Sequence, residues 1–274
     1  MKQTRWIETI GALLLIGAGL IFLLDNLGLA PGWQPLLWSL LLLGGGILFL
    51  LAFAMERSRW WLLIVGFALL GAGASALLNQ FLHLPGDVAG AAFFASLAVG
   101  FGGVYLVQRH HNWWALIPGG VMGILAAVTL LSAAVGGEVI AAGFFLGLGL
   151  IFVGLYFAEI DGQRHNWWAL IPAGALFSLA AVVTLSVYGQ GAAAGAALFL
   201  GLGLTFGVLY LLRGPARPLG WAWIPALALL AFGFFILAVA GEPIYGRLFW
   251  PLALIVAGLA LVARTWRRSG RGWD

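Results

Sequence analysis

Long apolar stretches separated by short polar loops run along the whole chain. Each stretch is about as long as the roughly 20 residues that carry a helix across ~30 Å of hydrocarbon. A backbone in hydrocarbon must satisfy its own hydrogen bonds, and the period-2 alternation of a β-barrel is absent, so the stretches predict helices. Ten can be marked, at 7–24, 34–54, 60–78, 88–107, 113–135, 138–158, 167–188, 191–212, 221–240 and 247–264.

The pattern repeats at a period of about 54 residues. NWWALIPGGVMGILAAVTLLS (112–132) and NWWALIPAGALFSLAAVVTLS (166–186) are identical at 14 of 21 positions, and FLGLGL recurs at 145–150 and 199–204. The period holds two spans and two loops, so the repeated unit is a helical hairpin. Five units begin near Trp6, Trp60, Trp113, Trp167 and Trp221, with bounds of about 1–58, 59–110, 111–163, 164–216 and 217–274.

A unit with an even number of spans brings each copy back into the membrane in the same direction. Such a parallel repeat differs from the inverted repeats of many secondary transporters. We therefore expect an all-α integral membrane protein, a single polytopic domain over 1–274. It would have ten transmembrane helices as five tandem hairpins, arranged as an open arc or a closed bundle.

Composition and charge agree with a membrane location. The chain is 63% hydrophobic and 8% charged, whereas a soluble domain carries roughly 25% charged residues. Basic residues enriched on one side mark the cytoplasm, which places both termini there. The other side has Arg247 alone; the cytoplasmic side has Lys2, Arg5, Arg57, Arg59, Arg109, Arg164, Arg213, Arg217, Arg264, Arg267, Arg268 and Arg271.

Two further features of the charge pattern limit the partners and the N-terminus. The basic residues stand at helix ends rather than in one patch, so the formal charge of +4 does not indicate nucleic-acid binding. The first apolar stretch resembles a signal peptide but runs into Asp25 and Asn26 without a small-residue cleavage site. It therefore predicts a retained first span.

The sequence offers no constellation for catalysis, metal binding or cofactor binding. There is no cysteine, which excludes disulfides, thiolate chemistry and cysteine-ligated clusters. No ionisable residue falls at mid-depth of a span, where it would mark a transport path. The histidines His83, His110, His111 and His165 lie at span ends without a helical partner, and we expect interfacial residues rather than haem or metal ligands. The prediction is a protein that is not an enzyme.

Mild polar residues, glycines and prolines fit helix packing. The interior hydroxyls should hydrogen-bond their own helix or a neighbour: Ser39, Ser75, Ser96, Thr129, Ser178, Thr184 and Thr205. Glycines gather in the even-numbered spans and predict close helix approach, although the run Gly44–Gly46 could instead mark a broken helix. They are Gly44, Gly45, Gly46, Gly100, Gly102, Gly103, Gly143, Gly147, Gly149, Gly154, Gly195, Gly201, Gly203 and Gly207. Pro118, Pro172 and Pro225 suit the first turn of their helices.

Tryptophans and acids mark the two membrane edges. The pairs Trp60-Trp61, Trp113-Trp114 and Trp167-Trp168 stand beside Arg or His and are typical of interfacial anchors, with an aromatic cage or pigment contact as the alternative. The outer loops carry Asp25, Asp87, Glu138 and Glu242. These acids are typical of caps and turns, and a ring of acids attracting cations at a pore mouth is the alternative.

The first hairpin, residues 7–57, resembles the LiaI–LiaF-like transmembrane regions of bacterial membrane proteins. The likeness rests on LLDNLGL (23–29) and LWSLLLLGGGILFL (37–50), where that family commonly has Leu-Trp-Pro-Leu. Ser39 replaces the proline here, and FWPLALIVAGLAL (249–261) restores it. The resemblance implies a bacterial cytoplasmic-membrane protein that associates with other membrane components, sometimes in envelope-stress sensing. It brings no catalytic residues.

Together these patterns favour a non-enzymatic integral membrane protein that acts through interaction. A scaffold, an accessory or a sensing subunit would pack its helices against membrane partners or against a second copy of itself. A small-molecule transporter or channel of about ten spans is the alternative, and an intramembrane lipid or cofactor binder is the third. A hydrated cavity at the midplane would favour the transporter.

Overall fold

The helices are continuous over most of the apolar stretches. A computed structural model describes residues 4–29, 32–132, 134–158, 160, 166–214 and 219–240, together with 251, 254, 255 and 258. The chain divides into two compact units, Met1–Ala169 and Leu170–Asp274. Throughout the described residues the fold is all-α.

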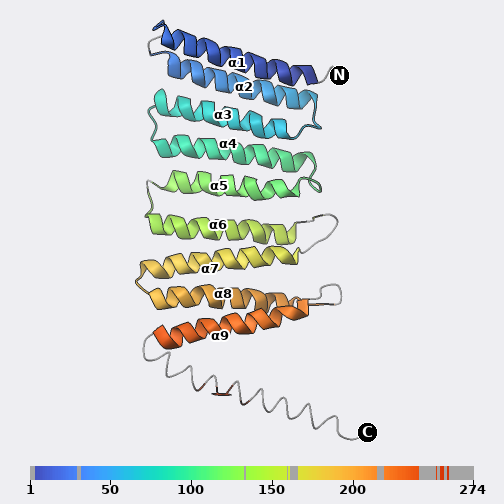
Figure 1. Cartoon of the computed structure of the whole chain (residues 1–274), viewed down its shortest axis with the longest axis vertical. Coiled ribbons are helices and arrows are strands. Elements are labelled where there is room, and N and C mark those ends of the chain that lie inside the picture. The colour runs from blue at the N-terminus through green and yellow to red at the C-terminus, as the bar shows by residue number, and fades with distance from the viewer. Residues whose placement is uncertain are drawn as a thin grey trace. The chain divides into compact units, whose positions relative to one another are not determined.

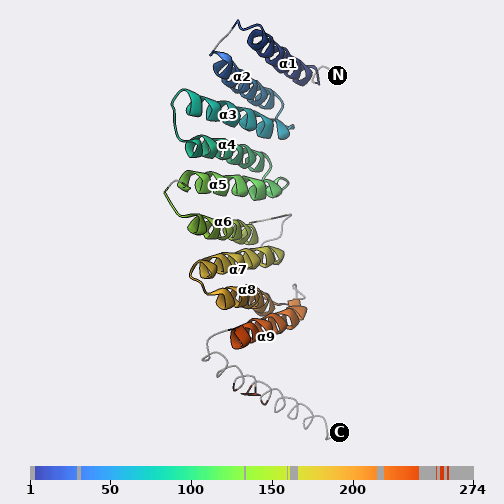
Figure 2. The ribbon, with the colours of Figure 1, turned by 60° about the vertical axis from the view of Figure 1, so that its left-hand side comes forward.

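In the first unit, consecutive helices lie side by side and run antiparallel (Figures 1 and 2). Each helix makes its substantial contacts with the helices before and after it in sequence, so the unit is one layer thick. The elements are α1 (Thr4–Asn26), α2 (Gln34–Met55), α3 (Trp61–Gln80), α4 (Gly86–Val107), η1 (Trp113–Ala115), α5 (Leu116–Leu131), α6 (Gly137–Phe157) and η2 (Trp167–Ala169).

The second unit follows the same order of packing, with α7 against α8 and α8 against α9. A short 3₁₀ turn, η3, precedes α9 and contacts both α8 and α9. The elements are α7 (Leu170–Val187), α8 (Gly191–Leu211), η3 (Leu219–Ala222) and α9 (Trp223–Ala240). Helix α7 ends in a turn where Gly189 has φ +68°, and the N–H groups of Gly189 and Gln190 donate to the carbonyls of Ser186 and Leu185. This is the glycine-terminated helix end expected from a left-handed residue.

Nine of the ten expected spans correspond to helices in the described residues, and all nine are long and apolar enough to cross a membrane. Their ends agree with the expected bounds to within a few residues. The tenth stretch, 247–264, lies for the most part outside the described residues. Pro118, Pro172 and Pro225 each stand in the first turn of a helix, as the sequence predicts. The missing N–H of a proline breaks no helical hydrogen bond there.

Large apolar side chains cover the two open faces of these helices. Leu15, Leu150 and Leu211 are 75%, 62% and 78% exposed, and many other leucines, isoleucines and phenylalanines are about half exposed. Contiguous apolar surface of this extent is not stable against water. Bilayer hydrocarbon is the solvent that suits it, and these helices have the composition and length of a multi-pass membrane protein.

Glycines allow neighbouring helices to approach closely. A Cβ added at Gly46 of α2 would lie 2.8 Å from the carbonyl oxygen of Gly66 in α3, and one added at Gly66 would lie 3.3 Å from the carbonyl oxygen of Gly46. The two backbones therefore touch directly. Helix α2 is unbroken through Gly44–Gly46, so the alternative of a broken helix at this run is wrong.

Most neighbouring helices exchange a glycine and a larger side chain reciprocally. Each helix offers a glycine as a hole, and one turn away it offers a knob that enters the hole of its neighbour. The pairs are Gly17–Leu41 with Gly45–Leu14, Gly46–Leu70 with Gly66–Leu50, Gly71–Ser96 with Gly100–Phe67, Gly120–Ile151 with Gly147–Ile124, Gly174–Thr205 with Gly201–Ser178, and Gly203–Leu230 with Gly233–Leu200. The even-numbered helices therefore supply only half of the packing glycines, and the odd-numbered helices supply the rest.

Candidate functional site

The turns at the arginine-bearing ends of the helices share one backbone geometry. The N–H of Leu62 donates to the carbonyl of Arg59 at 3.1 Å, that of Ala115 to Asn112 at 3.0 Å, and that of Ala169 to Asn166 at 2.9 Å. Before α5 and α7 this bond closes the Trp-Trp-Ala turns η1 and η2. The turn places an apolar side chain, Leu62, Ala115 or Ala169, against the preceding helix.

Several of the best-buried side chains of the described residues lie at these turns. Leu62 is 1% exposed, and Ala115, Ala169 and Ala222 are 0% exposed. In the first unit each of the first three is the centre of a separate apolar cluster, which also includes Phe49, Val104 or Leu155 respectively. The buried clusters therefore lie where the chain turns from an even-numbered helix toward the next odd-numbered one.

Asparagine side chains tie two of the turns to the helix before them. The side-chain amide of Asn112 donates to the carbonyl of Val104 at 3.0 Å. The amide of Asn166 donates to two carbonyls, those of Leu155 at 3.0 Å and Ala158 at 2.8 Å. These carbonyls lie in the last turn of α4 and in the last turn and C-cap of α6, where helix carbonyls run out of partners within the helix. The carbonyl of Leu155 also accepts a hydrogen bond from the N–H of Ala158 at 3.2 Å. Oδ1 of Asn112 is buried and accepts no hydrogen bond from the described residues.

The tryptophan pairs contact one another from hairpin to hairpin. In the first unit the ring centroids of Trp60 and Trp114 are 5.1 Å apart, and those of Trp113 and Trp168 are 6.0 Å apart. The pair Trp113-Trp114 thus gives one ring to the pair before it and one to the pair after it. Because the rings lie at span ends, they suit interfacial anchoring. They also link successive turns through aromatic contacts, which the sequence did not indicate.

The hydroxyl groups inside the spans are engaged in hydrogen bonds to backbone. Ser39, which is 0% exposed, donates to the carbonyl of Pro35 at 2.8 Å, and Ser96 of α4 donates across to Phe67 of α3 at 2.6 Å. Three more donate to the carbonyl four residues earlier: Ser178, Thr184 and Thr205. The expected pairing of hydroxyls with their own helix or a neighbour is confirmed for these five residues.

The acids and histidines are dispersed at span ends. Asp87 and Glu138 stand in the first turn of α4 and α6, whose N-cap residues are Pro85 and Gly136. A carboxylate at that place interacts favourably with the helix dipole. Asp25 accepts a hydrogen bond from the side chain of Gln34 at 3.0 Å, and Glu242 lies outside the described residues. Among the described residues no group of His, Asp and Glu is arranged to hold a metal ion.

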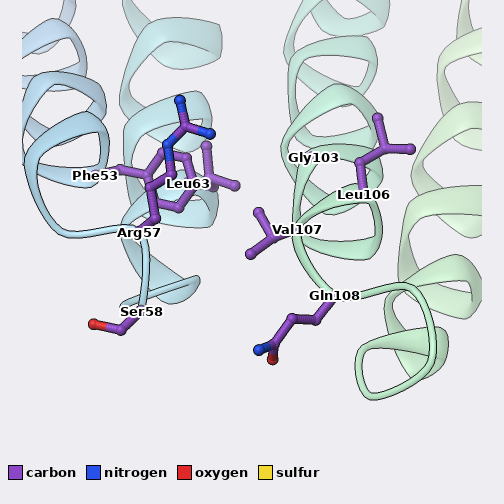
Figure 3. Close-up of a pocket in the computed structure, with 8 residues that line it drawn as sticks. All are labelled: Phe53, Arg57, Ser58, Leu63, Gly103, Leu106, Val107 and Gln108. Atoms are coloured by element: carbon purple, nitrogen blue, oxygen red, sulfur yellow. The ribbon is translucent and has the colours of Figure 1, made fainter.

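An open hollow of about 620 Å³ lies at the arginine-bearing end of the first unit, between the turn after α2 and the end of α4 (Figure 3). Its wall is apolar on the side of the helices, and its rim carries polar groups. The lining residues are Phe53, Arg57, Ser58, Leu63, Gly103, Leu106, Val107 and Gln108. A second, smaller hollow of about 330 Å³ lies between the other ends of α4 and α5 and is lined by Ala and Val or Leu side chains.

The sequence matches no family model, and neither curated proteins nor solved structures show similarity to it. The hollow beside Arg57 had no signal in the sequence, because its walls come from α2, α3 and α4 together.

Proposed function

We propose that this chain is a non-enzymatic scaffold or accessory subunit of the bacterial cytoplasmic membrane. It acts by packing the outer faces of its helix row against membrane partners or a second copy of itself. Five tandem hairpins, and hence ten spans, complete the row. The reciprocal glycine packing recurs with the repeat and supports this arrangement, since Gly120 and Gly147 stand 54 residues before Gly174 and Gly201.

The observation that carries the proposal is the outward face of α2. Its three consecutive glycines have three environments: Gly45 meets Leu14 of α1, Gly46 meets Gly66 and Leu70 of α3, and Gly44 has no atom within 4 Å of an added Cβ. On the same face as Gly44 lie Leu40, Ile47 and Leu51, which are 53%, 52% and 56% exposed. In lipid, a glycine between large side chains is typical of a surface that receives another helix.

The hydroxyl bonds support the scaffold over a transporter. A water-filled path needs polar groups free to face it, whereas Ser39, Ser96 and Thr184 donate to backbone carbonyls. The charge pattern supports an orientation with the arginine-bearing turns and both termini in the cytoplasm. Because the chain has no cysteine, single cysteines at positions 58 and 108, set against 86 and 137, can be labelled from either side of the membrane to test that orientation.

The experiment compares two substitutions on one helix. Gly44→Leu adds a side chain where nothing in the row is displaced, and Gly46→Leu forces α2 and α3 apart. Assemblies are extracted from native membranes in mild detergent and sized by native electrophoresis, and the thermal midpoint of each variant is measured. We expect Gly44→Leu to keep the parent's midpoint and to lose the larger assembly, and Gly46→Leu to lower the midpoint.

An unchanged assembly in the Gly44→Leu variant would mean that this face contacts only lipid. A parent protein that migrates as a single copy without partners would likewise contradict the scaffold. If, in addition, vesicles containing the purified parent released or took up small solutes, the transporter would replace the scaffold as the proposed function.

A further inference from the structure

The hollow beside Arg57 combines a cation with an apolar wall at the level where the spans end. Helix α2 ends at Met55, α3 begins at Trp61 and α4 ends at Val107, so the hollow lies at headgroup depth. In Figure 3 the side chain of Arg57 runs from the turn back toward the helix bodies, in the direction of Phe53 and Leu63, and Val107 points from α4 into the space opposite. Ser58 and Gln108 lie at the outer rim.

Arg57 is the unpaired cation of its turn. Its neighbour Arg59 forms an ion pair with Glu56 at 2.8 Å, which cancels those two charges. Arg57 is exposed and has no ion pair, hydrogen bond or ring contact with the described residues. Arg109, which follows Gln108 of the rim, adds a second positive charge to the same end. The charge at the hollow is therefore positive.

The arginine at the end of α8 shows the alternative arrangement. The guanidinium of Arg213 lies over the ring of Tyr210, 3.8 Å from its centroid, and donates to the carbonyl of Tyr210 at 3.3 Å. Its charge is held by its own helix end, in the manner of a basic residue beside the negative pole of a helix. The difference between the two arginines indicates that Arg57 is arranged for a partner outside the chain.

We propose that the hollow binds the phosphodiester headgroup of an anionic glycerophospholipid. The guanidinium of Arg57 donates to the phosphate oxygens, for which its planar fork of N–H groups is well suited. The first part of an acyl chain lies along Leu63, Leu106 and Val107. The volume of about 620 Å³ is within the roughly 300–1,000 Å³ of small-molecule sites. The site is independent of the proposed scaffold role, because it needs only the bilayer and this end of the first unit.

The test measures binding of dioleoylphosphatidylglycerol and dioleoylphosphatidylcholine to the full chain in detergent by native mass spectrometry. Arg57→Gln removes the cation, Val107→Phe fills the apolar side of the hollow and keeps the cation, and Arg213→Gln is the matched control at another helix end. We expect phosphatidylglycerol affinity to fall about fivefold in Arg57→Gln, as expected for one arginine near a lipid surface. It should also fall in Val107→Phe and stay unchanged in Arg213→Gln, and phosphatidylcholine should bind more weakly throughout.

Several outcomes would overturn the site. Equal losses in Arg57→Gln and Arg213→Gln would show general attraction to basic residues, and full binding by Val107→Phe would show adsorption at the rim without the hollow. Equal affinity for the two lipids would remove the role of charge. Inorganic phosphate is added as a competitor, and we expect it to leave bound phosphatidylglycerol in place; efficient displacement would make this a site for free phosphate. Circular dichroism and the thermal midpoint exclude unfolding as the cause in each variant.

Discussion

The hairpin of α5 and α6 and the hairpin of α7 and α8 have similar first helices and share the two glycines that face each other's helix, Gly120 and Gly147 in one and Gly174 and Gly201 in the other, yet they pack differently. Ile124 and Ile151 are the knobs of the first, and Ser178 and Thr205 stand at the same repeat positions in the second. In the first hairpin the Cδ1 atoms of Ile124 and Ile151 are the atoms nearest to a Cβ added at the facing glycine, at 3.0 and 2.6 Å.

In the second hairpin, atoms next to the backbone make the contact. The Cβ atoms of Ser178 and Thr205 lie 2.9 and 2.7 Å from a Cβ added at the glycines that they face, and their hydroxyl oxygens lie closer still. Helices α7 and α8 accordingly have the more extensive interface. Each hydroxyl also donates to the carbonyl of the glycine on its own helix, Gly174 or Gly201. A small polar knob therefore leaves no unpaired donor in lipid. The glycines therefore set the register of the two helices, and the side chains that face the glycines set the separation of the helices.

The largest expected effect comes from filling a hole in each hairpin. Gly201→Leu should cost about 3 kcal/mol of unfolding free energy, because the facing Ser178 has only its Cβ and Oγ and cannot rotate away. Gly147→Leu should cost about 1 kcal/mol, because the end of the Ile124 side chain can move aside. Denaturation in mixed micelles measures both values. Equal losses would mean that knob length does not set the tolerance of the hole.

Exchanging the knobs should have an intermediate effect. Ser178→Ile with Thr205→Ile should move α7 and α8 toward the upper end of the roughly 8–10 Å range of helix separations and cost about 2 kcal/mol. The reverse exchange, Ile124→Ser with Ile151→Thr, should bring α5 and α6 closer. Distances between spin labels on added cysteines report the separation, since the chain has none of its own. An unchanged distance in both exchanges would refute the role of the knobs.

The smallest expected effect is a difference in stability loss between substitutions of the two turn asparagines, Asn166 and Asn112. Asn166→Leu should cost about 1.5 kcal/mol, since two carbonyls lose a donor, and Asn112→Leu about 0.5 kcal/mol, since one carbonyl loses a donor and a buried acceptor is removed with it. The turn before α9 shows that leucine fits such a place: Leu219 is 1% exposed, three residues before the fully buried Ala222. Thermal midpoints of the two variants give the order, and a larger loss for Asn112→Leu would contradict it.

The spans could be predicted from sequence because a helix in hydrocarbon must be apolar over its whole length. Any residue within α2 or α6 need only be apolar, so length and composition locate the helix to within a few residues. The prolines were predictable for a similarly local reason. Which helix packs on each side of a given helix depends on residues far away in the sequence. The environments of Gly44, Gly45 and Gly46 could therefore be distinguished only once the order of the helices was known.

The candidate sites were less predictable because they depend on which side chains pair. That Glu56 contacts Arg59 and leaves Arg57 unpaired is a matter of rotamers and turn geometry. The contact of Trp60 with Trp114 joins residues of different hairpins. The sequence does hold a signal for the reciprocal packing. Gly120 and Ile124 are four residues apart, as are Gly147 and Ile151, so in antiparallel helices each glycine can face the isoleucine of the other helix.

Within each unit a helix makes substantial contact only with its sequence neighbours, so the energy of the unit is made of nearest-neighbour terms, as in solenoid proteins. A gene duplication that added one hairpin would need to match a single new interface and would leave all the others as they were. Adding or removing a whole hairpin should therefore change the stability of the remaining helices little. A force applied at one terminus should likewise extract the protein from the membrane in steps, helix pair by helix pair, rather than in one cooperative event.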